Sequence, residues 1–321
     1  MIVRTKPSLR GLRDVAMSIF LFGCSDICGA VDAPGVEWPD PSKSAMISGV
    51  FRDSMIVLRA TSRDAGAIDG LVWRGKQFIN SEDHGRELQA AAAFSNRHRE
   101  CFNPTEAGSA KDGLGGSSTS RLLSLKVEPH RLTTATQLAF WLDPSDPKHC
   151  ADSSAPKEGP LSHDVYRKVV TIGVLGHENL IEFRSSFEIG DSRILGGFEA
   201  PTGYMPAEFS SFWIFDPRDQ KLEPESGDIA YQPKPIILST TDKKYALGVY
   251  APPGQGAQIG YGAQRFTGPK MASPTLKWNV FFIQNKVDPG PHDFTSYVII
   301  GSLDDVSETL KTLTASASGS Q

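Results

Sequence analysis

Ionisable side chains are crowded into residues 80–89, NSEDHGRELQ, around a single glycine. His84 can exchange a proton near neutral pH, and the planar guanidinium of Arg86 can hold a carboxylate. If the segment is a strand, His84 and Arg86 share one face, whereas Asp83 and Glu87 share the other. The pattern predicts a polar site in which His84 transfers protons and the other three bind substrate. The alternative is a solvated turn with surface ion pairs.

Two further carboxylates lie in residues 97–108, RHRECFNPTEAG. Glu100 and Glu106 are close enough in sequence to supply the acid and the base that glycoside cleavage needs. Asn103 lies between them and can orient a hydroxyl group. The segment therefore predicts catalytic roles for both glutamates and substrate binding by Asn103, with an Asx-Pro turn as the equally supported alternative.

Aromatic residues dominate residues 202–216, TGYMPAEFSSFWIFD. Aromatic faces stack on the C–H face of a sugar ring, while a carboxylate accepts its hydroxyl groups. On this basis Tyr204 and Trp213 are predicted to stack against a sugar and Glu208 to bind it. The alternative is that the rings fill the core. A last aromatic segment, LKWNVFF (276–282), places Trp278 and Asn279 on opposite faces of a strand, so one of them is expected in the core.

Sequence motifs for other kinds of catalysis or cofactor binding are absent from this chain. The sequence contains no GxSxG elbow, no P-loop, no dinucleotide-binding glycine pattern and no HExxH. We therefore expect no cofactor and no metal. The net charge of −4, the pI near 6.0 and the lack of a basic stripe argue against nucleic acid as a partner.

The N-terminus resembles an export signal. Four basic residues precede a short apolar run, VAMSIFLFG (15–23), and small residues follow it. Residues 1–33 are therefore predicted to be a leader, cleaved near Ala30 or Ala33, or to end in a lipid anchor at Cys24. That anchor would be the protein's only membrane attachment. The remaining alternative is a cytosolic protein with an apolar N-terminal helix.

The body of the exported chain would retain two cysteines, Cys101 and Cys150. If the protein is exported, they are candidates for one disulfide. The enclosed loop of about 50 residues would give a stabilisation on the order of 3–4 kcal/mol. Two unrelated buried thiols are the alternative.

Short alternating or β-branched runs separated by turn residues predict a chain made mainly of strands. Residues 85–94 are also assigned as a strand, and only 304–314 reads as a helix. We expect an all-β fold: one large antiparallel two-sheet β-sandwich over residues 45–314, with a short C-terminal helix. Residues 34–44 would be a linker and 315–321 a flexible tail. Two smaller sandwiches divided near 155–162 are the alternative.

The segments 67–89, 100–121, 202–216 and 245–250 resemble secreted bacterial β-sandwich proteins of uncharacterised function and, more broadly, galactose-mutarotase-like carbohydrate-active proteins. That resemblance implies a supersandwich fold and a His–Glu acid–base pair, roles that His84 and Glu208 would fill. The leading expectation is an exported protein that acts on a glycan or sugar by general acid–base chemistry. A non-catalytic glycan-binding or envelope lipoprotein and a structural surface protein are the alternatives.

Overall fold

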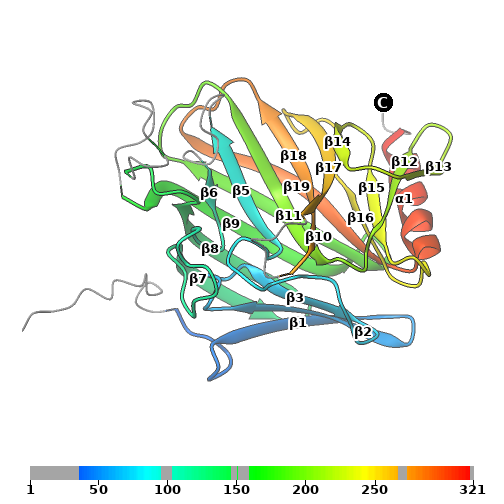
Figure 1. Ribbon diagram of the computed structural model, residues 1–321, viewed down its shortest axis with the longest axis horizontal. Coiled ribbons are helices and arrows are strands. Elements are labelled where there is room, and N and C mark those ends of the chain that lie inside the picture. The colour runs from blue at the N-terminus through cyan, green and yellow to red at the C-terminus, as the bar shows by residue number, and fades with distance from the viewer. Residues whose placement is uncertain (1–35, 95–102, 146–149, 151–158, 267–272, 319–321) are drawn as a thin grey trace, which may run out of the picture.

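The computed structural model describes residues 36–94, 103–145, 150, 159–266 and 273–318. Nineteen strands and one helix are found in these residues, and every strand pairing is antiparallel. Figure 1 shows a broad, strongly curved sheet with a smaller sheet beneath it and the helix at one side. This confirms the predicted all-β fold with a single C-terminal helix.

The smaller sheet has four strands in sequence order: β1 (Ser44–Phe51), β2 (Ser54–Thr61), β3 (Ile68–Trp73) and β4 (Lys76–Gln77). The larger sheet has fifteen. Its spatial order is β13 (Lys221–Glu225), β12 (Ser211–Asp216), β15 (Ile236–Ser239), β16 (Ala246–Tyr250), β19 (Gly290–Gly301), β10 (His177–Ile189), β9 (Leu161–Val174), β8 (Arg131–Phe140), β6 (Pro104–Thr105), β5 (Gln89–Phe94), β11 (Gly196–Pro206), β18 (Thr275–Gln284), β17 (Gln258–Phe266) and β14 (Ile229–Gln232). The fifteenth strand, β7 (Arg121–Glu128), also pairs with β8 but has no place in this linear order.

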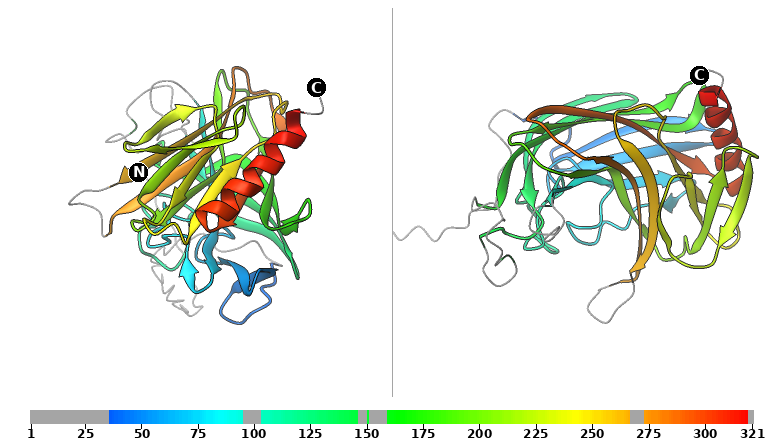
Figure 2. Two further views of the ribbon diagram at one scale, coloured as in Figure 1. Left: turned by 90° about the vertical axis from the view of Figure 1, so that its right-hand side faces the viewer. Right: turned by 90° about the horizontal axis from the view of Figure 1, so that it is seen from above.

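The large sheet folds back on itself, so that two of its walls face each other. Phenylalanine rings from four strands meet between the walls: Phe187 on β10, Phe198 on β11, Phe282 on β18 and Phe294 on β19. Their centroids lie 4.9 Å apart for Phe187–Phe198 and 4.4 Å apart for Phe282–Phe294. Figure 2 shows the curvature from above. Burying these rings removes apolar area from water and so contributes to the stability of the fold.

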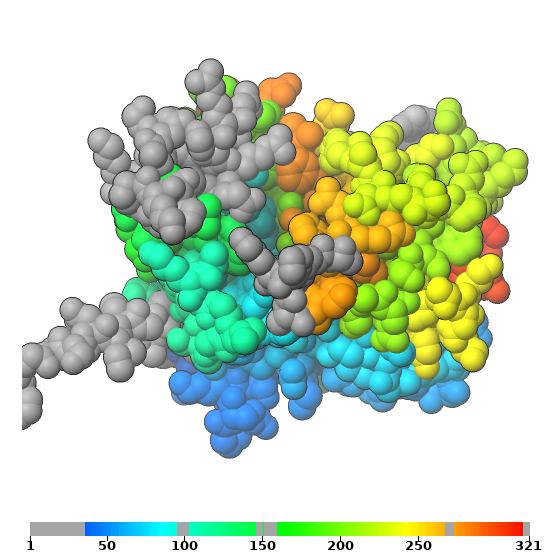
Figure 3. Space-filling model, in the orientation of Figure 1, coloured from blue at the N-terminus to red at the C-terminus, as the bar shows by residue number. Residues whose placement is uncertain are grey.

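The small sheet covers one side of this core. On β1 the buried residues Ala45 and Ile47 alternate with more exposed neighbours, the pattern of a strand with one wet face. Gly49 lies so close to the β9 residue Ile172 that an added Cβ would come within 2.6 Å of it. The absence of a side chain at Gly49 therefore lets β1 approach β9. Figure 3 shows the small sheet, in blue and cyan, along the lower part of the molecule.

Helix α1 (Leu303–Ser318) begins at a capping box. The Asp305 amide donates to the Ser302 hydroxyl at 3.2 Å, and the Ser302 amide donates to the Asp305 carboxylate at 3.0 Å. Val306, Leu310 and Leu313 bury one face of the helix against the large sheet. The predicted apolar face is therefore confirmed, and the helix ends four residues later than expected.

Candidate functional site

A cavity of about 460 Å³ lies in the wall of the large sheet formed by β5, β6, β11, β17 and β18, where the loop before β5 meets them. Five of the residues predicted to form a site line it: Asp83, His84, Arg86, Asn103 and Tyr204. These residues come from three separate parts of the chain. The structure therefore gathers part of the predicted set in one hollow.

A bulge in β11 shapes the cavity wall. The register of β11 with both β5 and β18 shifts between Glu199 and Thr202, next to the cis peptide bond Ala200–Pro201. Residues three apart on a regular strand face opposite sides, but the extra residue of a bulge changes that alternation. Glu199, Thr202 and Tyr204 consequently all line the cavity.

Glu199 and Lys277 form an ion pair in this wall. The Lys277 ammonium donates to Glu199 Oε1 at 3.0 Å, and the Asn279 amide donates to the same oxygen at 3.2 Å. Burial disfavours the Lys277 ammonium, but the charge of Glu199 and the hydrogen bonds with Glu199 and Tyr204 outweigh burial and raise the pKa of Lys277 above its usual value. The side chains retain exposures of 16% for Glu199 and 22% for Lys277, so both remain open to the cavity.

Three aromatic rings contribute to the same wall: Trp141, Tyr204 and Phe266. The Tyr204 and Phe266 centroids lie 6.3 Å apart, and the Lys277 ammonium lies 5.6 Å from the Tyr204 centroid. Trp141 packs against Gly85, where an added Cβ would lie only 2.7 Å from the indole ring. The cavity thus combines half-buried rings with a charged pair, a combination that suits a sugar ring.

Arg86 makes its polar contacts with other residues of the protein. Its guanidinium lies 3.0 Å from carboxylate oxygens of both Glu82 and Asp83, and it also donates to the Ser273 carbonyl at 3.2 Å. Only 6% of the side chain is exposed. Arg86 therefore fastens the loop before β5 to the start of the segment that leads into β18.

His84 is fully buried, and both its ring nitrogens contact backbone carbonyl oxygens. Nδ1 lies 2.9 Å from the Gly113 oxygen and Nε2 lies 2.9 Å from the Arg63 oxygen. A ring with both nitrogens engaged in this way has no free position for a substrate proton. His84 therefore supports the cavity wall, and its predicted role in proton transfer has no geometric support here. Residues 80–88 form a loop rather than the strand on which the predicted alternation rested.

Glu106 and Glu87 do not reach the cavity, because both side chains point into the interior. Glu106 is fully buried and paired with the equally buried Lys168. Glu87 is fully buried next to Asp64 and lies 3.4 Å from the Arg63 guanidinium. Both carboxylates thus belong to the packing of the core.

Glu208 and Trp213 lie elsewhere on the molecule. Glu208 is 48% exposed and pairs with Lys76 at 2.9 Å. The Trp213 indole donates to the Ser239 hydroxyl at 2.9 Å and packs with the apolar cluster beneath α1. Of the three residues predicted to bind a sugar in 202–216, only Tyr204 therefore lines the cavity, because β11 ends at Pro206 and β12 runs in another part of the sheet.

Glu100 and Cys101 lie outside the described residues. Cys150 is disulfide-bonded, and the three other cysteines of the chain also lie outside the described residues. The pairing of Cys101 with Cys150 stays a prediction. Trp278 is fully buried, so it is the core member of its predicted pair.

Glu199 and Lys277, which make the charged pair of the cavity, were not among the predicted site residues. Pro201 is one signal for the bulge beside Glu199, because a proline within a sheet is found mainly at edges and bulges. Lys277 directly precedes Trp278, in a run whose clearest features are its aromatic residues and Asn279.

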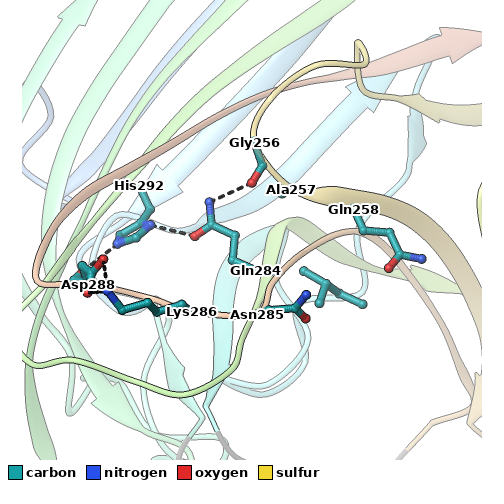
Figure 4. Close-up of a pocket in the computed structure, with 9 residues that line it drawn as sticks. Gly256, Ala257, Gln258, Gln284, Asn285, Lys286, Asp288 and His292 are labelled. Atoms are coloured by element: carbon teal, nitrogen blue, oxygen red, sulfur yellow. Dashed lines mark hydrogen bonds and ion pairs between the residues drawn. The ribbon is translucent and has the colours of Figure 1, made fainter.

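A second cavity, of about 410 Å³, lies beyond the opposite ends of β17 and β18. Figure 4 shows His292 between Gln284 and Asp288: its nitrogens lie 2.7 Å from Gln284 Oε1 and 2.8 Å from the Asp288 carbonyl oxygen. Its ring stacks on Phe198, with centroids 5.6 Å apart. The polar groups of His292, Gln284 and Asp288 in this second cavity are thus engaged with one another.

Within the described residues, no cluster of three or more His, Cys, Asp or Glu side chains is placed to hold a metal. In the same part of the chain, no helix combines the length and apolar character needed to cross a membrane.

The chain matches no protein-family model and no curated protein. Solved structures with a similar arrangement include the Slr1438 protein of Synechocystis, at 10% identity and a TM-score of 0.43, covering 80% of this chain and 96% of that one. A galactose mutarotase related enzyme of Lactobacillus acidophilus is 12% identical, with a TM-score of 0.40 and coverage of 82% and 99%. The heparan sulfate lyase HepC of Pedobacter heparinus is 8% identical, with a TM-score of 0.42, over 81% of this chain and 35% of that one. At this level of similarity, none of their activities carries over to this chain.

Proposed function

We propose that this chain is a carbohydrate-active protein that binds a sugar or glycan in the first cavity and acts on it by general acid–base chemistry. The observation that carries the proposal is the Glu199 carboxylate, which opens on a hollow walled by Trp141, Tyr204 and Phe266. The rings offer apolar faces for the sugar, and the carboxylate accepts a proton or a hydroxyl hydrogen bond.

Glu199 would be the proton acceptor in a reaction of glycosidase, lyase or epimerase type. Its Oε1 is held by Lys277 and Asn279, which fixes the orientation of the carboxyl group. Asp83, whose Oδ1 accepts the Gly85 amide at 3.0 Å, supplies a second carboxylate in the same wall.

Replacing Glu199 with glutamine tests this role. The amide retains the shape of the side chain but cannot take up a proton, so turnover of the best substrate from a glycan panel should fall about 100-fold or more. Glu208→Gln is the matched control, because Glu208 is exposed and lies outside the cavity. Unchanged turnover in Glu199→Gln would refute the catalytic assignment. Binding across the panel without any product would favour the non-catalytic glycan-binding alternative.

We also propose that the protein is exported, with residues 1–33 as its leader and Cys24 as a candidate point of lipid attachment. The disulfide of Cys150 supports export, because disulfides persist mainly in oxidising compartments. Expression of the full chain with a C-terminal tag, followed by cell fractionation, tests this. The tagged protein should appear outside the cytoplasm and lack its leader. Recovery of the uncleaved chain in the cytoplasm would contradict the proposal.

A further inference from the structure

Two buried oxygen atoms of the first cavity accept no hydrogen bond from the described residues: Glu199 Oε2 and Asn103 Oδ1. Glu199 Oε2 lies 3.0 Å from the Lys277 ammonium, but the hydrogen bond of that ammonium goes to Oε1. A buried acceptor without a donor is unfavourable by an amount comparable to a lost hydrogen bond. Asn103 Oδ1 has no partner, and Glu199 Oε2 has only its ion pair with Lys277. Both atoms can therefore accept a hydrogen bond from a ligand that brings donors into the cavity.

The cations at this wall are already neutralised. Arg86 lies 3.0 Å from carboxylate oxygens of Glu82 and Asp83, and Lys277 pairs with Glu199. Among the described residues, these are two separate groups of ion pairs, with three carboxylates around two cations; Asp83 and Glu199 line the cavity and Glu82 lies beside its lining. An incoming carboxylate or sulfate would meet these carboxylates and the unpaired oxygens without a free cation to hold it.

The geometry points to an uncharged sugar, bound through donated hydroxyl groups, as the ligand of this cavity, with uronic-acid and sulfated glycans excluded. One hydroxyl would donate to Glu199 Oε2 and another to Asn103 Oδ1. The ring would lie against the aromatic wall. This inference deepens the proposed function and rests on it, because it names the chemical class of the sugar bound at the same site.

The test compares binding of neutral and acidic oligosaccharides of equal length to the wild-type protein. The probes are tetrasaccharides of glucose, galactose, mannose and xylose against tetrasaccharides of galacturonate, mannuronate and guluronate, measured by calorimetry at constant ionic strength. The best neutral ligand should bind about tenfold or more tightly than the best acidic one, since one like-charge contact near a protein surface accounts for such a ratio.

Two variants test whether Glu199 and Asn103 cause the preference for neutral over acidic ligands. Glu199→Gln removes the carboxylate charge and leaves Lys277 without its counter-charge, so the ratio of neutral to acidic affinity should fall. Asn103→Ala removes one acceptor and should weaken neutral ligands about tenfold. Glu208→Gln, outside the cavity, should leave the ratio unchanged.

The outcomes separate this inference from the function on which it rests. Tighter binding of an acidic tetrasaccharide by the wild-type protein would overturn the inference and leave the carbohydrate function standing. Binding of no tetrasaccharide from either set would overturn the proposed function. A ratio that is unaffected by Glu199→Gln would overturn the part assigned to the carboxylate charge.

Discussion

Replacing Lys168 with methionine is expected to lower the free energy of unfolding by about 3–5 kcal/mol, because it leaves the Glu106 carboxylate buried without a partner. Lys168 lies on β9 and is 1% exposed, and its ammonium bonds both Glu106 and the Gly66 carbonyl, the latter at 2.8 Å. Burial raises the pKa of the Glu106 carboxyl and lowers that of the Lys168 ammonium, while their attraction opposes both shifts. Each charge is therefore tolerable only in the presence of the other.

Urea unfolding at neutral pH measures this effect, with two further variants as controls. Lys126→Met removes a lysine that is 69% exposed and pairs with Glu128, so its effect should stay below about 1 kcal/mol. The double variant Lys168→Met, Glu106→Gln should recover part of the loss, because no buried charge is then left unpaired. The introduced glutamine still has a side-chain oxygen to accept the Ala90 amide, as Glu106 does at 3.1 Å. A loss below about 1 kcal/mol in Lys168→Met alone would show that the pair is dispensable.

The strand content of this protein can be predicted from sequence because its strands alternate clearly. The run NLIEFRSSFEI (179–189) alternates polar and apolar residues over most of its length, which predicts a strand, and the structure places it in β10 (His177–Ile189). Strand β11 was harder to predict, since its sequence GGFEAPTGYMP contains three glycines and two prolines, which usually mark turns. Its pairing with both β5 and β18 supplies the hydrogen bonds that this local sequence does not indicate.

The site could be predicted only in part, because sequence shows which groups can ionise but not which way they point. Asp83, Asn103 and Tyr204 reach the cavity, while Glu87, only four residues after Asp83, turns into the core. The difference arises in the loop before β5, where Arg86 and His84 fix the backbone through contacts with Ser273, Gly113 and Arg63. Those partners are distant in sequence, so no local pattern could reveal them.

The buried carboxyl pair Glu87–Asp64 is expected to make stability fall as the pH rises. Burial, and next the charge of Asp64, raise the pKa of Glu87 well above its usual value, and burial also raises the pKa of Asp64. The folded protein therefore binds protons here more tightly than the unfolded chain does. The stabilisation is complete below the unfolded pKa of about 4.5 and is lost as the pH rises through the elevated pKa of the folded state.

Glu87→Gln should remove much of this pH dependence. The amide resembles the protonated carboxyl in shape and carries no charge, so the variant should gain stability relative to the wild type as the pH increases. Each unit by which folding raises the pKa of Glu87 adds about 1.4 kcal/mol to the difference at high pH. Thermal unfolding between about pH 4 and pH 9 measures how the stability of the wild type and of the variant changes with pH, with the exposed Glu208→Gln as the control. An equal loss of stability at every pH would instead mean that Glu87 is ionised in the folded protein and that Arg63, 3.4 Å away, holds it as a buried salt bridge.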